Sequence, residues 1–271
     1  MMLRPGSLPE PVREDDPRLD PYRDLKGRAH RADALRFVAE SEHAVLRLLA
    51  ARERYPLESV LVEPSRADRM LATVPAGTPV LVLEPERLAR LIGFPLHRGV
   101  VACARRPAPE PWPPAWLGER PRWRVLLAAG PSDPVNVGLL ARNARGFSAD
   151  LLLLDAVAGD PLARRAIRAS MGHVFGLPWA RVQDPLQALQ DLRRACPQAR
   201  FLAASPRPGA TPLSSLEPPA QAVLVLGHED RGLGPELLGA CDEEVTIPLD
   251  PEVDSLNVAA AAAVFLYALG R

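Results

Sequence analysis

The sequence predicts an α/β protein with a small first domain and a second domain built on a parallel sheet. In the second half of the chain, short and almost wholly apolar runs alternate with helical patterns, which is typical of parallel strands covered by helices on both faces. A proline-dense stretch at residues 105–122 predicts a stiff linker, because proline lacks a backbone donor and fixes φ. The 271 residues are enough for two domains, each with its own core.

The first domain is expected at residues 25–104, after a polar and proline-rich segment at 1–24 that predicts a flexible tail. Apolar residues at helical spacing predict a helix over 34–52. Short β-rich runs and two further helical segments predict strands at 59–63, 79–84 and 99–104 and helices at 65–72 and 85–92. Mixed elements of this kind commonly form one layered domain.

The second domain is expected at residues 123–271. Its apolar runs predict strands at 123–129, 149–155, 199–205, 222–227 and 243–249. Helical patterns fall between several of these strands, including 136–145 and 185–195. Such a sheet binds ligands outside the carboxyl ends of its strands, so the residues that follow each strand are the candidates for a site.

The chain closes with an apolar run at 258–269 that carries no charged residue. A surface helix would show a charged face, so we expect this helix to be buried in the domain or against a second subunit. The run is too short to span a membrane. Ser255 and Asn257 precede it, and two interpretations are open for them: helix capping, or a binding site built on the first turn.

Composition narrows the class of protein. Lysine plus arginine and aspartate plus glutamate both total 33, so the chain lacks the overall basic charge that marks many nucleic-acid binders, although a local basic surface stays open. Nothing at the polar N-terminus resembles a signal peptide. Cys103, Cys196 and Cys241 are scattered, which predicts neither a disulfide framework nor a metal cluster and favours a reducing cytoplasm.

The first candidate site follows the strand at 123–129. Ser132 or Asp133 can cap the next helix and Pro134 suits its first turn, while Asn136 and Arg142 offer polar side chains. Residues six apart on a helix point to different sides, so the two share a site only if Asn136 projects from the capping loop. The alternative is a cap and a solvated arginine.

The second candidate site follows the strand at 222–227, where Gly227, Gly232 and Gly234 crowd a turn. Glycine allows positive φ and close approach of backbone to a ligand. The spacing matches neither a dinucleotide-binding nor a phosphate-loop motif. His228 and Glu229 lack a second histidine at helical spacing, which argues against a metal site. With Ser255 and Asn257 after the strand at 243–249, three strand ends carry polar or glycine-rich loops, which suits a polar small molecule bound mostly through main chain.

These motifs resemble those of the SpoU (TrmH-type) branch of the SPOUT superfamily of RNA ribose methyltransferases. The resemblance covers residues 122–271 and rests on four stretches in the family's order: NVGLLARNARGF (136–147), RASMGHVFGLPW (168–179), LGHEDRGLG (226–234) and IPL with DSLNV (247–258). Ala259 and His228 depart from residues common in that family. The first domain resembles, more loosely, a small α/β RNA-binding fold of large-subunit ribosomal proteins.

The resemblance implies a trefoil knot of loops that holds S-adenosylmethionine. Gly227, Ile247 and Leu256 would bind it through main chain, and the same pocket would include Leu226, Gly232 and Leu249. Asn136 and Arg142 would face the target ribose, with the pocket and the arginine supported by Glu229, Ser255 and Asn257. The family also implies a homodimer with sites at the interface, although knots are otherwise rare.

The expected reaction moves a methyl group from a sulfonium to a ribose 2′-oxygen, which needs alignment but no metal. Free arginine is a poor base because its pKa is very high, so we expect Arg142 to clamp phosphate and stabilise negative charge. Arginines near the pocket could bind RNA phosphate or simply be solvated: Arg145, Arg164, Arg165 and Arg168. The two-domain plan favours ribosomal over transfer RNA. The alternative is a non-catalytic RNA-binding or ribosome-assembly protein with a relic pocket.

Overall fold

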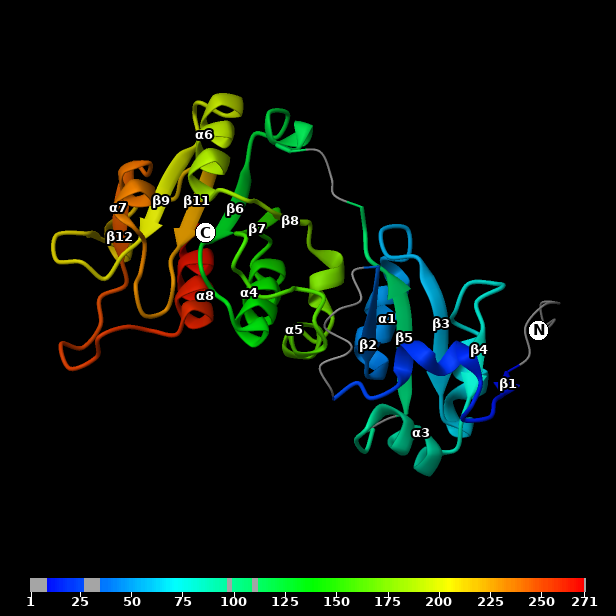
Figure 1. The fold of residues 1–271 in the computed structure, drawn as a ribbon. Coiled ribbons are helices and arrows are strands. Elements are labelled where there is room, and N and C mark those ends of the chain that lie inside the picture. Colours follow the sequence, from blue (N-terminus) through cyan, green and yellow to red (C-terminus); the bar gives the residue numbers. More distant parts are fainter. Residues whose placement is uncertain (1–8, 27–34, 97–98, 109–111, 271) are drawn as a thin grey trace. The chain divides into compact units, whose positions relative to one another are not determined.

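The computed structural model describes residues 9–26, 35–96, 99–108 and 112–270. They form two compact units (Figure 1). The first unit takes Met1–Ala108 and Leu162–Gly176, and the second takes Pro109–Pro161 and Leu177–Arg271.

The first unit is built on a five-stranded mixed sheet in the order β1-β4-β3-β5-β2. Its strands are β1 (Glu10–Pro11), β2 (Arg36–Glu40), β3 (Leu57–Val62), β4 (Val80–Val82) and β5 (Val100–Arg105). Strand β5 pairs antiparallel with β2 and β3, whereas β4 is parallel to β1 and β3. The three strands predicted from β-rich runs are therefore present, and two more join them.

Helices cover both faces of this sheet. The 3₁₀ helix η1 (Pro17–Tyr22) and α3 (Pro85–Ile92) pack on one face, around a core that includes Leu61, Leu81 and Val101. Contacts with the strands place α1 (Glu42–Ala50) and α2 (Ala67–Leu71) against the sheet as well. The prediction of a flexible tail at 1–24 is wrong for the described residues 9–24, because Leu19 and Tyr22 are fully buried in this core.

The predicted helix over 34–52 is wrong in its first half. Residues 36–40 form β2, and only Glu42–Ala50 are helical. Ser41, with φ 81°, separates the two elements, and its side chain accepts a hydrogen bond from the N–H of Ala44. Helical spacing misled the prediction because both faces of β2 are buried, so Phe37 and Val38 are adjacent and both apolar.

The segment 162–176, predicted within the second domain, packs with the first unit. It contains α5 (Arg164–Ala169) and a 3₁₀ turn at His173–Gly176. Phe175 lies among the rings of Phe37 and Tyr55, with centroids 5.6 and 5.3 Å away. A Cβ atom at Gly172 would come within 2.8 Å of the Ala44 Cα, so this docking depends on glycine.

The second unit is built on a seven-stranded sheet in the order β10-β12-β9-β11-β6-β7-β8, with every described pair parallel. The strands are β6 (Trp123–Ala128), β7 (Leu151–Leu154), β8 (Trp179–Arg181), β9 (Arg200–Ala204), β10 (Thr211–Pro212), β11 (Gln221–Leu226) and β12 (Glu243–Thr246). All five strands predicted here are present. The predicted α/β class with a parallel sheet is confirmed, and the trefoil knot stays a prediction.

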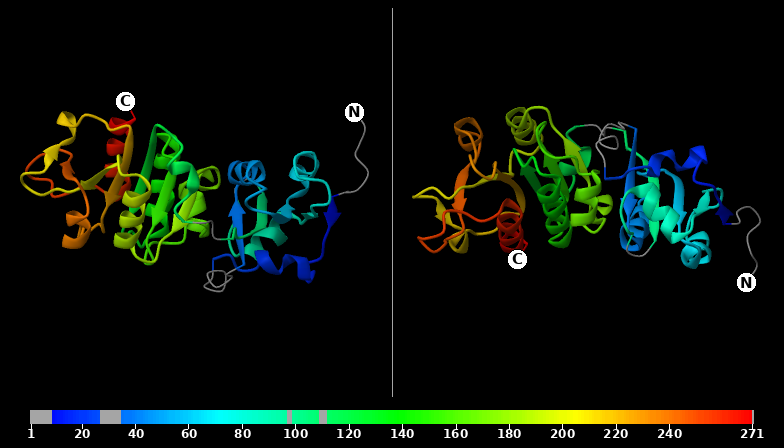
Figure 2. Two further views of the ribbon diagram at one scale, coloured as in Figure 1. Left: turned by 90° about the horizontal axis from the view of Figure 1, so that it is seen from above. Right: turned by 60° about the horizontal axis from the view of Figure 1, so that its bottom comes forward.

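Two layers of helices cover this sheet. One layer contains α6 (Pro185–Ala195) and α7 (Pro235–Gly239), which share a core with Val125, Leu127 and Phe201. In the other, α4 (Pro134–Gly146) and α8 (Val258–Leu269) lie side by side (Figures 1 and 2). None of the helices in the described ranges is both long and apolar enough to cross a membrane.

The end of the predicted linker belongs to the second unit. Trp112 and Trp116 pack against the core beneath α6, and the indole N–H of Trp112 donates to Asp191 at 3.3 Å. Residues 112–122 are thus held on the second unit.

Candidate active site

The candidate site lies at one edge of the second sheet. Strands β12, β9 and β11 are parallel neighbours, so the loops that follow them meet at their carboxyl ends. A cavity of about 390 Å³ opens there, within the size range of small-molecule sites. Its wall includes all six residues predicted to bind the cofactor: Leu226, Gly227, Gly232, Ile247, Leu249 and Leu256.

A tight hairpin of main chain forms one wall of this cavity. The N–H of His228 donates to Gly232 O at 3.1 Å, and the N–H of Gly232 donates back to His228 O at 2.8 Å. Gly232 has φ +63°, and a Cβ atom at Gly227 would lie 2.3 Å from the Gly232 carbonyl carbon. The turn therefore needs glycine at both positions, and it leaves main chain facing the cavity.

His228 and Asp230 are hydrogen-bonded to each other within this hairpin. The N–H of Asp230 donates to Nδ1 of His228 at 3.0 Å, which engages the ring in the turn itself. Among the residues that the structure describes, no group of three or more His, Cys, Asp or Glu is placed to hold a metal ion.

Helix α4 begins as its sequence predicts. Asp133 is the N-cap and accepts a hydrogen bond from the N–H of Val135 at 3.1 Å, and Pro134 is the first helical residue. Asn136 is inside the first turn rather than in the capping loop. Its side chain nevertheless reaches the hairpin, because its amide donates to the Glu229 carboxylate.

Asn257 combines the two roles that its sequence position left open. Its Oδ1 caps α8 by accepting from the N–H groups of Ala259 and Ala260 at 2.9 and 3.4 Å. Its amide donates to Oδ1 of Asn136 at 3.1 Å. Asn257, Asn136 and Glu229 therefore form one hydrogen-bonded chain beside the cavity, which Glu229 and Ser255 line directly.

Arg142 stands apart from this chain of side chains. It is exposed on α4, and its side chain makes no hydrogen bond or ion pair with any described residue. The same is true of Arg145, one turn further on. The structure thus brings together four of the five expected catalytic residues, and the arginine is not among them.

The arginines of α5 have structural partners. Arg164 binds the buried Glu40 carboxylate at 3.0 Å and lies 4.7 Å from the centre of the Phe94 ring. Arg168 approaches the same carboxylate at 3.7 Å. Arg164 therefore belongs to the docking of 162–176 on the first unit, whereas the Arg168 side chain is 72% exposed.

The loop after β9 also belongs to the site, although it was not predicted from the sequence. Ser205, Pro206 and Arg207 line the cavity, because β9 lies between β12 and β11 in the sheet. Ser205 is buried, and its Oγ accepts from the N–H of Arg207 at 3.3 Å. The strand-end rule used for the other loops would have found it.

Helix α8 is buried on only part of its surface. Val258, Ala261 and Phe265 line the cavity. Ala259, Ala262, Leu266 and Leu269 are buried in the core. Val264 and Tyr267, one turn apart, are 41% and 49% exposed. The expected burial of this helix is therefore incomplete within one chain, and the exposed stripe is apolar.

Comparisons with known proteins point to one family. The profile of the SpoU rRNA methylase family matches residues 124–267. An uncharacterised tRNA/rRNA methyltransferase of Mycobacterium bovis is 37% identical over 262 residues, which are 93% of this chain and 88% of that protein. A 23S rRNA (uridine(2479)-2′-O)-methyltransferase of Streptomyces viridochromogenes is 30% identical over 144 residues, 52% of this chain and 50% of that protein.

A solved structure resembles this chain over most of its length. The SpoU methyltransferase AviRb of Streptomyces viridochromogenes, crystallised with S-adenosylmethionine, matches with a TM-score of 0.76 and 25% identity. The match covers 91% of this chain and 94% of that one.

Proposed function

Because the chain belongs to the SpoU rRNA methylase family, we propose that it methylates a ribose 2′-hydroxyl of RNA with S-adenosylmethionine as the donor. The observation that carries this proposal is the cavity at the ends of β9, β11 and β12, whose wall holds all six expected cofactor residues. Beside it, the hydrogen-bonded chain of Asn257, Asn136 and Glu229 supplies the polar groups that a substrate ribose needs.

The cavity fits the cofactor chemically. Leucine, isoleucine and phenylalanine side chains offer an apolar surface to an adenine ring, and the hairpin at 227–232 offers main-chain groups to its edge. Arg207 and Arg231 supply positive charge for a carboxylate, and Asp254 supplies negative charge for an ammonium. When bound, S-adenosylmethionine supplies a methyl group on a sulfonium, which becomes a thioether as the methyl group leaves.

Arg142 is proposed to act on the RNA rather than on the cofactor. Its guanidinium offers a fork of N–H donors that suits phosphate oxygens, so it binds a phosphate and stabilises negative charge on the attacking oxygen. Asn136 orients the ribose, and Glu229 holds Asn136 in place. The hydroxyl proton leaves to water or to a neighbouring acceptor.

A second copy of this chain is the proposed partner at the α4–α8 face. The Arg142 side chain has no partner among the described residues of its own chain, and Val264 and Tyr267 on the adjacent helix are 41% and 49% exposed. A two-fold dimer that buries the stripe would bring the arginine of one subunit toward the cavity of the other. The active site would then be complete only in the dimer.

Ribosomal RNA is proposed as the substrate in preference to transfer RNA. The relative from Streptomyces viridochromogenes that supports this is named for a 23S rRNA uridine, although it matches only 52% of this chain. The proposed location is the cytoplasm, where that substrate resides.

Two measurements test the proposal. Calorimetry should detect S-adenosylmethionine binding to the purified protein, and 2′-O-methyl mapping of total RNA should show one site that depends on the gene. Cofactor binding without any methylated site would contradict a catalytic role. Absence of cofactor binding at millimolar concentration would favour a relic pocket in an RNA-binding or assembly protein.

A further inference from the structure

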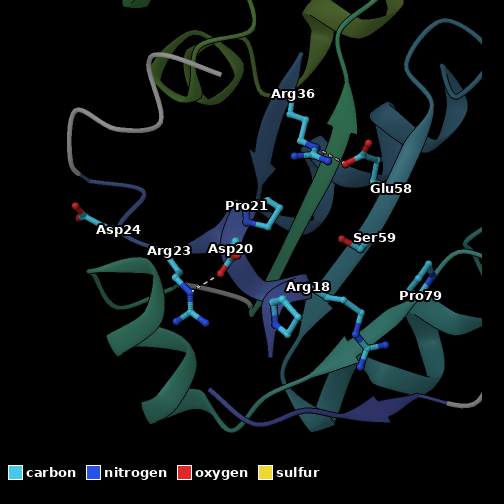
Figure 3. A pocket seen from close by; sticks show the side chains of 10 residues that line it. Arg18, Asp20, Pro21, Arg23, Asp24, Arg36, Glu58, Ser59 and Pro79 are labelled. Carbon is cyan, nitrogen blue, oxygen red and sulfur yellow. Dashed lines mark hydrogen bonds and ion pairs between the residues drawn. The ribbon is translucent and has the colours of Figure 1, made fainter. Parts of the chain in front are cut away.

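A second cavity, of about 620 Å³, opens in the first unit beneath the 3₁₀ helix η1 (Figure 3). It lies where β2, β3 and β4 begin, between those strand ends and the N-terminal segment. Ser59 lies between Pro21 and Pro79 in the view of Figure 3, with Arg36 and Glu58 together at one end. Nothing in the proposed chemistry of the second unit uses this cavity.

The charges of this cavity argue against a phosphate ligand. Its wall carries Arg18, Arg23 and Arg36, but each guanidinium already holds a carboxylate: Asp16 at 2.8 Å, Asp20 at 2.9 Å and Glu58 at 2.7 Å respectively. Asp20, Asp24 and Glu58 on the same wall balance the three positive charges. A neutral and polar ligand suits such a site better than an anion.

The hydrogen-bonding groups of the cavity are both fixed and mixed. Burial raises the pKa of Glu58, but hydrogen bonds from Arg105 and Arg36 outweigh it and hold that pKa below its ordinary value, so the group is an ionised acceptor at neutral pH. A carboxylate has about four acceptor positions, so it can accept further N–H groups. The Ser59 hydroxyl lies 2.7 Å from the Tyr22 hydroxyl and can form a further hydrogen bond to a ligand, next to the Glu58 carboxylate.

The walls also offer flat apolar surface. The rings of Pro21 and Pro79 are rigid and present apolar faces, and guanidinium planes stack on bases in RNA complexes. Proteins that read single-stranded RNA combine such stacking with hydrogen bonds to the edge of an unstacked base. Flat faces, fixed donors and acceptors, and zero net charge are the features that distinguish a base from a phosphate.

We propose that this cavity binds an unpaired nucleobase of the RNA substrate. The inference rests on the proposed function, because it assigns part of substrate recognition to the first unit. It makes the first unit a reader of base identity rather than a general anchor for phosphate. Binding here would therefore depend on sequence and only weakly on salt.

The test uses the full chain and labelled single-stranded pentaribonucleotides of A, C, G and U, measured by fluorescence anisotropy. We expect a preference among the four for the wild-type protein. Pro79→Ala removes an apolar ring face and Ser59→Ala removes a hydroxyl, so each should weaken binding of the preferred pentamer by roughly five- to tenfold. Pro64→Ala, an exposed proline of the same unit outside the cavity, is the matched control and should leave affinity unchanged.

The outcomes separate this inference from the proposed function. Equal binding of all four pentamers, or an abasic ribose-phosphate oligomer that binds as well as the preferred pentamer, would overturn it. A matching nucleoside monophosphate that binds as tightly as the pentamer would assign the cavity to a free nucleotide and overturn the RNA reading. Each cavity variant that keeps the wild-type melting temperature should bind S-adenosylmethionine as tightly as the wild type does. If the wild-type protein itself does not bind S-adenosylmethionine, the proposed function is contradicted instead.

Discussion

Asn257 donates a hydrogen bond to Oδ1 of Asn136 at 3.1 Å while its own Oδ1 caps helix α8. The Asn257 side chain therefore caps the start of α8 and also holds Asn136 in the first turn of α4. Because Asn136 continues the chain to Glu229 at the hairpin, the geometry of the cavity and the start of α8 depend on each other.

Substitution of Asn257 can separate these two roles. Asn257→Asp keeps an oxygen that can cap α8 but cannot donate to Asn136, so we expect a nearly unchanged melting temperature and methyl transfer lowered by roughly a hundredfold. Asn257→Ala should lose both the cap and the donated hydrogen bond, and its free energy of unfolding should fall by ~0.5–2 kcal/mol. Thermal melts and single-turnover rates measure the two effects. An Asp variant with full activity would show that the donated hydrogen bond has no part in the reaction.

Arg142→Ala should lower methyl transfer on the order of 10²–10³-fold while leaving affinity for S-adenosylmethionine nearly intact. The physical reason is that this exposed guanidinium has no contact with its own chain's cavity in the described residues. Arg142→Lys should also be poor, because an ammonium cannot form a bidentate fork. Isothermal titration gives the cofactor affinity. Equal loss of binding and rate would contradict a role on the RNA.

Mixed dimers test whether Arg142 acts across the subunit interface. Arg142→Ala and Asn257→Asp each inactivate a homodimer, but one site of the heterodimer would contain both native residues if the arginine comes from the partner. Co-expression should then restore about a quarter of wild-type activity, since half of the dimers carry one intact site. Val264→Glu, which places a charge in the exposed stripe, should yield monomers by light scattering and abolish the recovery. No recovery in a proven heterodimer would place Arg142 in its own chain's site.

The elements of the second unit were predictable because its strands are buried on both faces. Runs such as 222–227 are then apolar throughout, and the loops between them carry capping residues that mark helix starts, as Asp133 and Pro134 do for α4. The same two-sided burial made β2 look helical. Residues 9–24 were missed because a proline-containing 3₁₀ helix buries just Leu19 and Tyr22, too few side chains to give a period.

The cavity was predictable to the same extent, since the strand-end rule located its glycine hairpin and the start of α8. The rule could not show that Asn136 reaches Glu229, because that contact depends on the height of α4 above the sheet edge. Nor could it show that Arg164 donates a hydrogen bond to Glu40, a residue 124 positions away in the sequence. Contacts of this kind are set by packing between elements, which leaves no period in the sequence.

Cys241 should be unreactive at neutral pH. Burial, with a smaller effect of Asp242, raises the pKa of its thiol to about 12. An exposed cysteine has a pKa near ~8.5, so alkylation by iodoacetamide at pH 8 should be slower on the order of a thousandfold than in urea. The rate should rise about tenfold per pH unit up to pH ~11, and the neutral thiol's stabilising effect should fade above pH ~8.5. Peptide mass spectrometry follows the modification, and fast labelling of the native chain would contradict burial.

Arg207 should bind the carboxylate of the cofactor's amino-acid end. It stands on the loop that follows β9, between the loops of β12 and β11, and its described ion-pair partner, Glu244, is 3.9 Å away, too far for a hydrogen bond. Arg207→Ala should therefore weaken S-adenosylhomocysteine by roughly tenfold, as expected for a charge-assisted hydrogen bond of ~1.5–3 kcal/mol. 5′-Methylthioadenosine lacks the amino-acid end and should bind the variant and the wild type equally. Arg145→Ala, an exposed arginine on α4 outside the cavity wall, is the control and should change neither affinity. Equal weakening of both ligands in the Arg207 variant would mean that the cavity wall, and not the carboxylate contact, was lost.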